Sequence, residues 1–127
     1  MRNLSRILLV EDDDFTRFMM REIINTLGVE VDVAENGDIG CTQLERAPDT
    51  YSLVLMDIHM AHMSGVDAAR RIRASKEDPP RNVAIVAVTA DEDYHDDSVV
   101  GALGMNGYIA KPVTPGELMG LIDRYCV

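Results

Sequence analysis

Carboxylate, hydroxyl and ammonium groups follow directly after four short apolar segments of this sequence. In chain order, Ile7–Val10 precedes Glu11 and Asp12, Leu53–Met56 precedes Asp57, Val83–Val88 precedes Thr89, and Gly107–Ala110 precedes Lys111. Short apolar runs are typical of buried strands in parallel sheets, whose carboxyl ends meet at one edge and gather ligand-binding groups there. If the four strands are parallel, three carboxylates, a hydroxyl and an ammonium therefore lie close together.

The chemistry of such a cluster suits a metal ion and a phosphoryl group. Like charges ~4 Å apart repel by about 1 kcal/mol in water and about 4 kcal/mol near a protein surface, so crowded carboxylates need a cation or a raised pKa. Oxygen ligands with room for water suit Mg²⁺. Lys111 and Thr89 would then neutralise and hydrogen-bond the phosphoryl oxygens, and Asp57 is the carboxylate placed to form an acyl phosphate.

Each of these residues also has an ordinary structural explanation when it is taken alone. A single strand-end aspartate such as Asp57 is more often a turn former than a nucleophile. Thr89 alone suits a helix cap, and Lys111 alone suits a solvated surface charge. Only their joint arrangement favours a site over these explanations.

Composition and charge narrow the class of protein. The 127 residues fit one domain, residues 1–127, with an apolar fraction of 46% and a net charge of −10. This charge argues against direct nucleic-acid binding, which depends on clustered Lys and Arg. No apolar run approaches the roughly 20 residues of a membrane helix, and Met1–Ser5 is no signal peptide, so we expect a cytoplasmic protein that does not enter membranes by itself. Cys41 and Cys126 lack metal-ligand spacing and are expected to be reduced.

Helices must join the strands and cover the sheet. Asp13 or Asp14 can cap a first helix that runs to Leu27 and stops at Gly28. At ~100° per residue, its apolar side chains share one half of the helix, and we expect them to face inward. They are Phe15, Met19, Met20, Ile23, Ile24 and Leu27. Phe18 falls outside this half and beside the acid pair, where an exposed aromatic could anchor a partner protein.

The same alternation continues to the end of the chain. We expect a strand at Glu30–Ala34, a turn at Asn36–Gly37, a helix from about Asp38 to Ala47, a helix capped by Ser64, a weak glycine-containing helix over Asp93–Leu103, and a last helix opened by Pro115. The acidic run at 91–97 suits the start of a helix because of the helix dipole. Strands that alternate with helices indicate an α/β fold, a doubly wound parallel sheet covered on both faces.

The segments around the four strand ends resemble the receiver domain of response regulators in two-component signalling. They are Ile7–Asp12, Leu55–Met60 with Met63–Gly65, Val88–Ala90 and Gly107–Pro112, in the family's order and spacing from about Arg6 to Tyr125. The resemblance implies a flavodoxin-like (βα)5 fold with strand order 2-1-3-4-5. It also implies a domain that takes a phosphoryl group from a histidine kinase or a histidine phosphotransfer protein and then switches conformation or relays the phosphate.

The resemblance further implies a role for each matching residue. Asp57 would be the phosphoacceptor. Mg²⁺ would be bound directly by Asp12, through water by Glu11 and through the backbone carbonyl of His59. Thr89 and Lys111 would contact the phosphoryl oxygens, and Tyr108 would be the aromatic switch residue whose position follows Thr89. The peptide bond between Lys111 and Pro112 would be cis.

One position departs from the family pattern. Ala61 stands where proline is common, so the backbone there lacks the fixed φ of proline, and the lifetime of the phosphorylated state is open. The run Met105–Val113 and the Glu–Asp acid pair look most like receivers attached to hybrid sensor kinases. The fourth helix, fifth strand and fifth helix would form a face for a partner, a second copy of the chain or the rest of a longer protein.

Two other classes of protein stay open as alternatives. A Mg²⁺-dependent phosphatase of the aspartyl-phosphate type also uses a strand-end aspartate, but it usually has a second acid two residues later, where His59 stands here. A phosphate-independent interaction module usually lacks one of the acids, the threonine or the lysine, and none is missing here. In a receiver, any enzymatic activity would be limited to self-phosphorylation from phosphodonors and slow autodephosphorylation.

Overall fold

The structure is a computed structural model, and it describes residues 6–126. The segment Met1–Ser5 lies outside the described residues. The strands are β1 (Arg6–Val10), β2 (Glu30–Ala34), β3 (Leu53–Asp57), β4 (Ala84–Thr89) and β5 (Gly107–Ala110). The helices are α1 (Asp14–Thr26), α2 (Gly37–Arg46), α3 (Gly65–Arg73), α4 (Asp97–Ala102) and α5 (Pro115–Tyr125), with a short 3-10 helix, η1 (Glu92–Tyr94), before α4.

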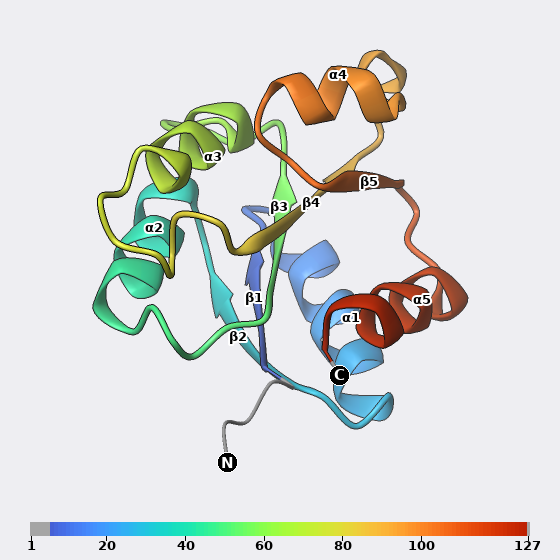
Figure 1. Cartoon of the computed structure of the whole chain (residues 1–127). Coiled ribbons are helices and arrows are strands. Elements are labelled where there is room, and N and C mark those ends of the chain that lie inside the picture. Colours follow the sequence, from blue (N-terminus) through green and yellow to red (C-terminus); the bar gives the residue numbers. More distant parts are fainter. Residues whose placement is uncertain (1–5, 127) are drawn as a thin grey trace.

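All neighbouring strands run parallel, in the order β2-β1-β3-β4-β5. The flavodoxin-like strand order is therefore confirmed. α2, α3 and α4 pack against one face of the sheet, and α1 and α5 lie side by side against the other (Figure 1). Every residue of β3 is buried, because this central strand is covered on both faces. None of the helices among residues 6–126 is long and apolar enough to cross a membrane.

Side-chain caps set where the helices begin. The Asp13 carboxylate accepts a hydrogen bond from the Thr16 N–H at 2.8 Å and caps α1, as predicted. The Asn36 side chain accepts from the Ile39 N–H at 2.8 Å. The chain bends at Asn36, as predicted, but α2 begins at Gly37, one residue before the predicted start. Such side-chain acceptors satisfy N–H groups that have no partner within the helix.

The predicted burial of α1 is only partly correct. Met20 and Ile24 are buried, whereas Phe15 and Met19 are 70% and 43% exposed, so the inward orientation predicted for those two residues is wrong. Phe18 is 52% exposed, as predicted from its position off the apolar half. The first turns of α1 therefore present a row of apolar side chains to the solvent.

Helix packing explains this exposure. α5 begins at Pro115, which lies beside Ile23 and Leu27 in the last turns of α1. α5 therefore covers the C-terminal part of α1 and leaves its first turns uncovered. Phe15 and Met19 line an open groove there.

The segment between β4 and β5 also differs from the prediction, because residues 93–103 do not form one helix. The Asp91 carboxylate accepts from the Asp93 N–H at 3.0 Å, and the Asp96 carboxylate accepts from the Ser98 N–H at 2.8 Å. Such local bonds compete with a continuous helix. η1 and the short helix α4 result, with His95 between them.

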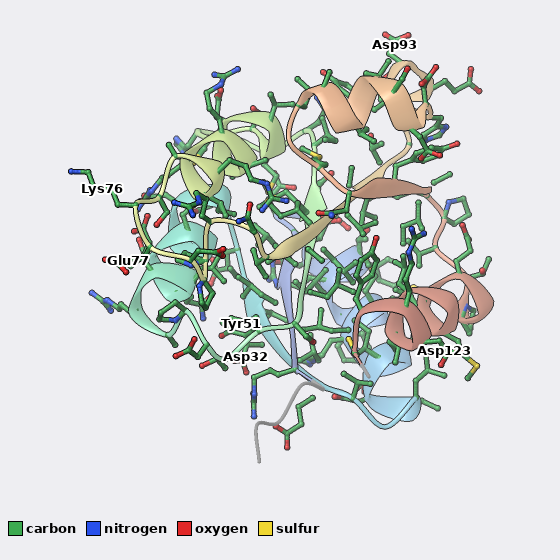
Figure 2. The ribbon with its side chains drawn as sticks, viewed as in Figure 1. Asp32, Tyr51, Lys76, Glu77, Asp93 and Asp123 are labelled. Atoms are coloured by element: carbon green, nitrogen blue, oxygen red, sulfur yellow. The ribbon has the colours of Figure 1, made fainter. Side chains whose placement is uncertain are left out.

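A network of polar side chains, made by Arg6, Asp32 and Tyr51, lies at the amino-terminal half of the sheet, away from the carboxyl ends of the strands. The Tyr51 hydroxyl donates to Asp32 Oδ2 at 2.7 Å, and the Arg6 guanidinium donates to Asp32 Oδ1 at 2.8 Å. Figure 2 shows Tyr51 and Asp32 close together near the amino end of β1. The network ties β1, β2 and the segment before β3 together. Cys41 and Cys126 are both free, as predicted, and both are buried.

A glycine sets how closely α3 approaches the end of β3. A Cβ atom on Gly65 would lie 2.1 Å from the Asp57 carbonyl oxygen and 2.9 Å from the Ile58 Cα. Gly65→Ala should therefore lower the free energy of unfolding by about 3 kcal/mol, because backbone atoms would have to move. Urea unfolding measures this change.

The matched control is Gly101→Ala in α4, where a Cβ atom would meet nothing within 4 Å. This substitution should raise the free energy of unfolding by about 0.5–1 kcal/mol, since alanine has the higher helix propensity. Equal effects of the two substitutions would show that the close approach at Gly65 does not constrain the fold.

Candidate functional site

The parallel register brings the predicted site residues to one edge of the sheet. Asp57 pairs with Val88, the residue before Thr89, and Thr89 pairs with Ala110, the residue before Lys111. Glu11 and Asp12 directly follow β1, which lies next to β3. The residues at the strand ends therefore stand at similar heights, and the predicted convergence is correct.

Three carboxylates meet at this edge. Oxygen atoms of Glu11, Asp12 and Asp57 all lie within 4.8 Å of one another. Glu11 and Asp57 are buried, with 1% and 5% of their surface exposed, while Asp12 is exposed. Crowded carboxylates with one solvent-facing member form a set of hard oxygen donors that an ion can reach from water.

The Lys111 ammonium is the counter-charge inside this cluster. Its Nζ lies 2.8 Å from Glu11 Oε1 and 3.4 Å from Asp57 Oδ1. Burial opposes the charged form of the lysine, but its contacts with Glu11 and Asp57 outweigh burial and raise the pKa of Lys111. The peptide bond that follows Lys111 is cis, as the resemblance implied.

The single positive charge of Lys111 does not neutralise three carboxylates, and the pKa of Asp57 is raised. Burial, and then the hydrogen bond and negative charge of Glu11, raise the pKa of Asp57 to about 7, against the opposing effect of Lys111. A divalent cation bound by the three carboxylates would remove this imbalance. The residues present therefore fit Mg²⁺, with Glu11, Asp12 and Asp57 able to hold it.

Thr89 is buried at the same edge, and its hydroxyl has one partner in the following loop. Thr89 Oγ1 accepts a hydrogen bond from the Asp91 N–H at 3.0 Å. Because a hydroxyl both accepts and donates, its hydrogen stays available for a further acceptor.

The His59 side chain contacts the loop after β4. Its Nε2 lies 2.7 Å from Asp91 Oδ2, and its ring meets the Tyr94 ring edge-on at 5.7 Å. The contact with His59 is the largest cause that lowers the pKa of Asp91. Asp91 thus joins the loops after β3 and β4, a role that the acidic run in the sequence did not reveal. The backbone carbonyl of His59 as a metal ligand stays a prediction.

Two further contacts were not predicted from the sequence. The Ala61 N–H donates to Asp12 Oδ2 at 3.3 Å, a bond that a proline at this position could not make because it has no N–H. The Tyr108 ring is stacked on His95, with ring centroids 5.3 Å apart. The departure from the family pattern at Ala61 therefore adds a contact to one of the three carboxylates.

A family model described as the response regulator receiver domain matches residues 7–123. The chain belongs to the response regulator receiver domain family. It is 36% identical over 126 residues to a two-component response regulator of Oryza sativa subsp. japonica, covering 98% of this chain and 96% of that protein. It is 30% identical over 125 residues to a hybrid signal transduction histidine kinase of Dictyostelium discoideum, covering 96% of this chain and 7% of the kinase. The chain thus matches almost the whole length of one relative, a response regulator, but only a small part of another, a hybrid kinase.

Solved structures extend the likeness to the site. The receiver domain of a sensor histidine kinase from Pseudomonas aeruginosa, which holds a magnesium ion in its active site cleft, matches with a TM-score of 0.83 and 31% identity over 97% of this chain and 98% of that chain. A response regulator from Thermotoga maritima in complex with Mg²⁺ and BeF matches with a TM-score of 0.81 and 29% identity over 95% of this chain and 98% of that one. Both share the fold that, in this chain, brings together Glu11, Asp12 and Asp57, which we call the acidic pocket.

A groove adjoins the acidic pocket. It has a volume of about 330 Å³ and is lined mainly by apolar residues of α1 and of the segment after β5. Phe15 and Met19 lie on one side and Pro112 and Val113 on the other, and Lys111 belongs both to the groove and to the pocket. A molecule bound in the groove would therefore reach the edge of the site.

The raised pKa of Asp57 makes the stability of the metal-free protein depend on pH. An aspartate in the unfolded chain titrates near its ordinary pKa of 3.8, whereas folded Asp57 titrates at about 7. The stabilising contribution of protonated Asp57 is thus complete below about pH 4 and is lost as the pH rises to about 7. Asp57→Asn should therefore make the metal-free protein about 1–3 kcal/mol more stable than the wild type at pH 8 and change it little at pH 4.

Urea unfolding in EDTA from pH 4 to pH 8 measures this difference. Asp123→Asn, at an exposed acid on α5 (Figure 2), serves as the control and should shift the stability equally at all pH values. A pH-independent effect of Asp57→Asn as well would contradict the raised pKa.

Proposed function

We propose that this receiver domain accepts a phosphoryl group on Asp57 from a phosphohistidine of a histidine kinase or a histidine phosphotransfer protein, with Mg²⁺. The observation that carries the proposal is the pairing of a buried Asp57 carboxylate with Lys111 Nζ at 3.4 Å, inside a set of acids that fits a divalent cation. The magnesium ions in two similar receiver structures support it.

The transfer step follows from the groups at hand. One Asp57 carboxylate oxygen attacks the phosphorus atom, an O–P bond forms, and the P–N bond to the donor histidine breaks. The electron pair of that bond stays on the imidazole nitrogen, which takes up a proton. Mg²⁺ would neutralise negative charge on the acids and on the phosphoryl oxygens.

The remaining residues position and stabilise the transferred group. Lys111, held in place by Glu11, pairs with a phosphoryl oxygen, and the Thr89 hydroxyl donates to another. Tyr108 then responds to the change at Thr89. A phosphatase of the aspartyl-phosphate type usually has an acid two residues after the nucleophile, and His59 stands there and contacts Asp91.

The groove beside Lys111 is the docking place that we assign to the donor protein. The donor histidine must come within bonding distance of Asp57, and Lys111 lies in both the groove and the pocket. The apolar lining suits an apolar helix surface, and the exposed carboxylates of Asp13 and Asp14 at the start of α1 suit basic residues around it.

Direct labelling tests the phosphoacceptor. Acetyl phosphate with Mg²⁺ should add one hydroxylamine-labile phosphoryl group, which intact-mass spectrometry detects. Asp57→Asn should abolish the label, and EDTA or Asp12→Ala should reduce it at least about tenfold, since a metal ligand is then missing. Asp123→Asn should label like the wild type. Equal labelling of Asp57→Asn would refute the assignment.

Exposed aromatic side chains test the docking groove. Phe15→Ala should slow transfer from a purified phosphorylated histidine phosphotransfer protein about tenfold, because aromatic anchors often dominate interfaces. Phe18, which is exposed on α1 and does not line the groove, gives a second variant: Phe18→Ala should also slow transfer, as its sequence position predicted. Labelling by acetyl phosphate should stay unchanged in both variants.

Ile39→Ala is the matched control, because Ile39 is 42% exposed on α2, on the opposite face of the sheet. It should leave both reactions unchanged. If Phe15→Ala slowed labelling by acetyl phosphate as much as transfer from the protein donor, the groove would have no specific role in docking.

A further inference from the structure

One histidine outside the acidic pocket, His95, contacts both the end of β4 and β5. His95 lies between η1 and α4. Its Nε2 is 2.8 Å from the backbone oxygen of Thr89, and its ring is stacked on the Tyr108 ring with centroids 5.3 Å apart and an interplanar angle of 11°. One side chain thus connects the end of β4 with β5 and is attached to the start of α4.

The hydrogen bond to Thr89 defines the protonation of this ring nitrogen. A backbone carbonyl can only accept, so Nε2 of His95 must carry the hydrogen. The same carbonyl also accepts the Lys111 N–H at 3.0 Å. Two donors occupy this oxygen, one from the residue after β5 and one from the loop before α4. The peptide group of Thr89 is therefore held from both sides.

The Thr89 hydroxyl connects the same loop to the acidic pocket. In this structure Thr89 Oγ1 accepts the Asp91 N–H at 3.0 Å. A hydroxyl that turns toward a phosphoryl oxygen on Asp57 changes its contact with Asp91, and the segment from Asp91 to His95 must then readjust. Because His95 is bonded to the Thr89 peptide and stacked on Tyr108, the readjustment reaches Tyr108 through this ring.

We propose that His95 is a positioning residue that holds Tyr108 in the arrangement of the unphosphorylated domain and transmits a change at Thr89 to Tyr108 and α4. The inference rests on the proposed function, because the change at Thr89 is the one that a phosphoryl group on Asp57 would cause. His95 itself contacts no reacting atom.

Two substitutions separate the two contacts of this side chain. His95→Phe keeps a flat ring against Tyr108 and removes the donor to Thr89, whereas His95→Gln keeps an N–H donor and removes the ring. Beryllofluoride with Mg²⁺ stands in for the phosphoryl group on Asp57. If the contacts of His95 favour the unphosphorylated arrangement, each variant should bind beryllofluoride about two- to tenfold more tightly than the wild type.

NMR of the Tyr108 ring and of the His95 nitrogens supplies a readout that a loss of stability would not mimic. In the ligand-free wild type, His95 should show the Nε2–H tautomer. Beryllofluoride should shift the Thr89 amide and the Tyr108 ring together. In His95→Gln, which loses the stacked ring, the Tyr108 ring should differ already without ligand. In both variants the Tyr108 ring should respond less to beryllofluoride, while the Thr89 amide still shifts.

The experiments on His95 can fail independently of the labelling experiment that tests the proposed function. Glu92→Gln, at an exposed residue of η1 in the same segment, should behave like the wild type. A Tyr108 response in both variants equal to that of the wild type, or an Nδ1–H tautomer, would overturn the role of His95. Should acetyl phosphate fail to label Asp57, the proposed function fails, and the tautomer and Tyr108 spectra of the ligand-free variants still decide whether His95 positions Tyr108.

Discussion

The contact of the Lys111 ammonium with the Glu11 and Asp57 carboxylates is the interaction on which the site depends. Glu11 is almost completely buried, so water cannot solvate its carboxylate, and the Lys111 ammonium at 2.8 Å is the counter-charge beside it inside the fold. Asp57 shares the same ammonium at 3.4 Å. Its raised pKa expresses what the single lysine leaves unbalanced. The site is therefore built to be completed by a cation.

In the function that we propose, the same charge balance links a bound Mg²⁺ to the phosphoryl group. A phosphoryl group adds negative charge and three acceptor oxygens next to carboxylates that already repel one another. Lys111 contacts Glu11 and carries only one positive charge. A divalent cation bound by the acids would therefore offset the added negative charge of the phosphoryl group. Asp12 suits its part because it is the exposed member of the three. An ion can bind and leave there without opening the buried pocket.

The fold and the centre of the site were predictable because the information is local along the chain. Apolar runs identify the strands, and the residues directly after them stand at the carboxyl edge whenever the strands are parallel. Phe15 and Met19 were misplaced because helical periodicity identifies an apolar half but not how far α5 extends along α1. The contacts of Asp91 and His95 were missed because they depend on where two loops meet, and the sequence shows only an acidic run.

Thr89 occupies the point where the stiff part of the fold ends. It makes the last register pair between β4 and β5, and the chain beyond it forms only the short helices η1 and α4, which begin with hydrogen bonds to the Asp91 and Asp96 carboxylates. β3 cannot yield when Asp57 changes, because all of its residues are buried between the helices. In the function that we propose, a change at Asp57 therefore acts on the least constrained neighbour, which is the loop after Thr89. The hydroxyl of this residue accepts the Asp91 N–H and its carbonyl accepts from His95 Nε2, so one residue at the edge of the acidic cluster is bonded twice to the less constrained loop after β4.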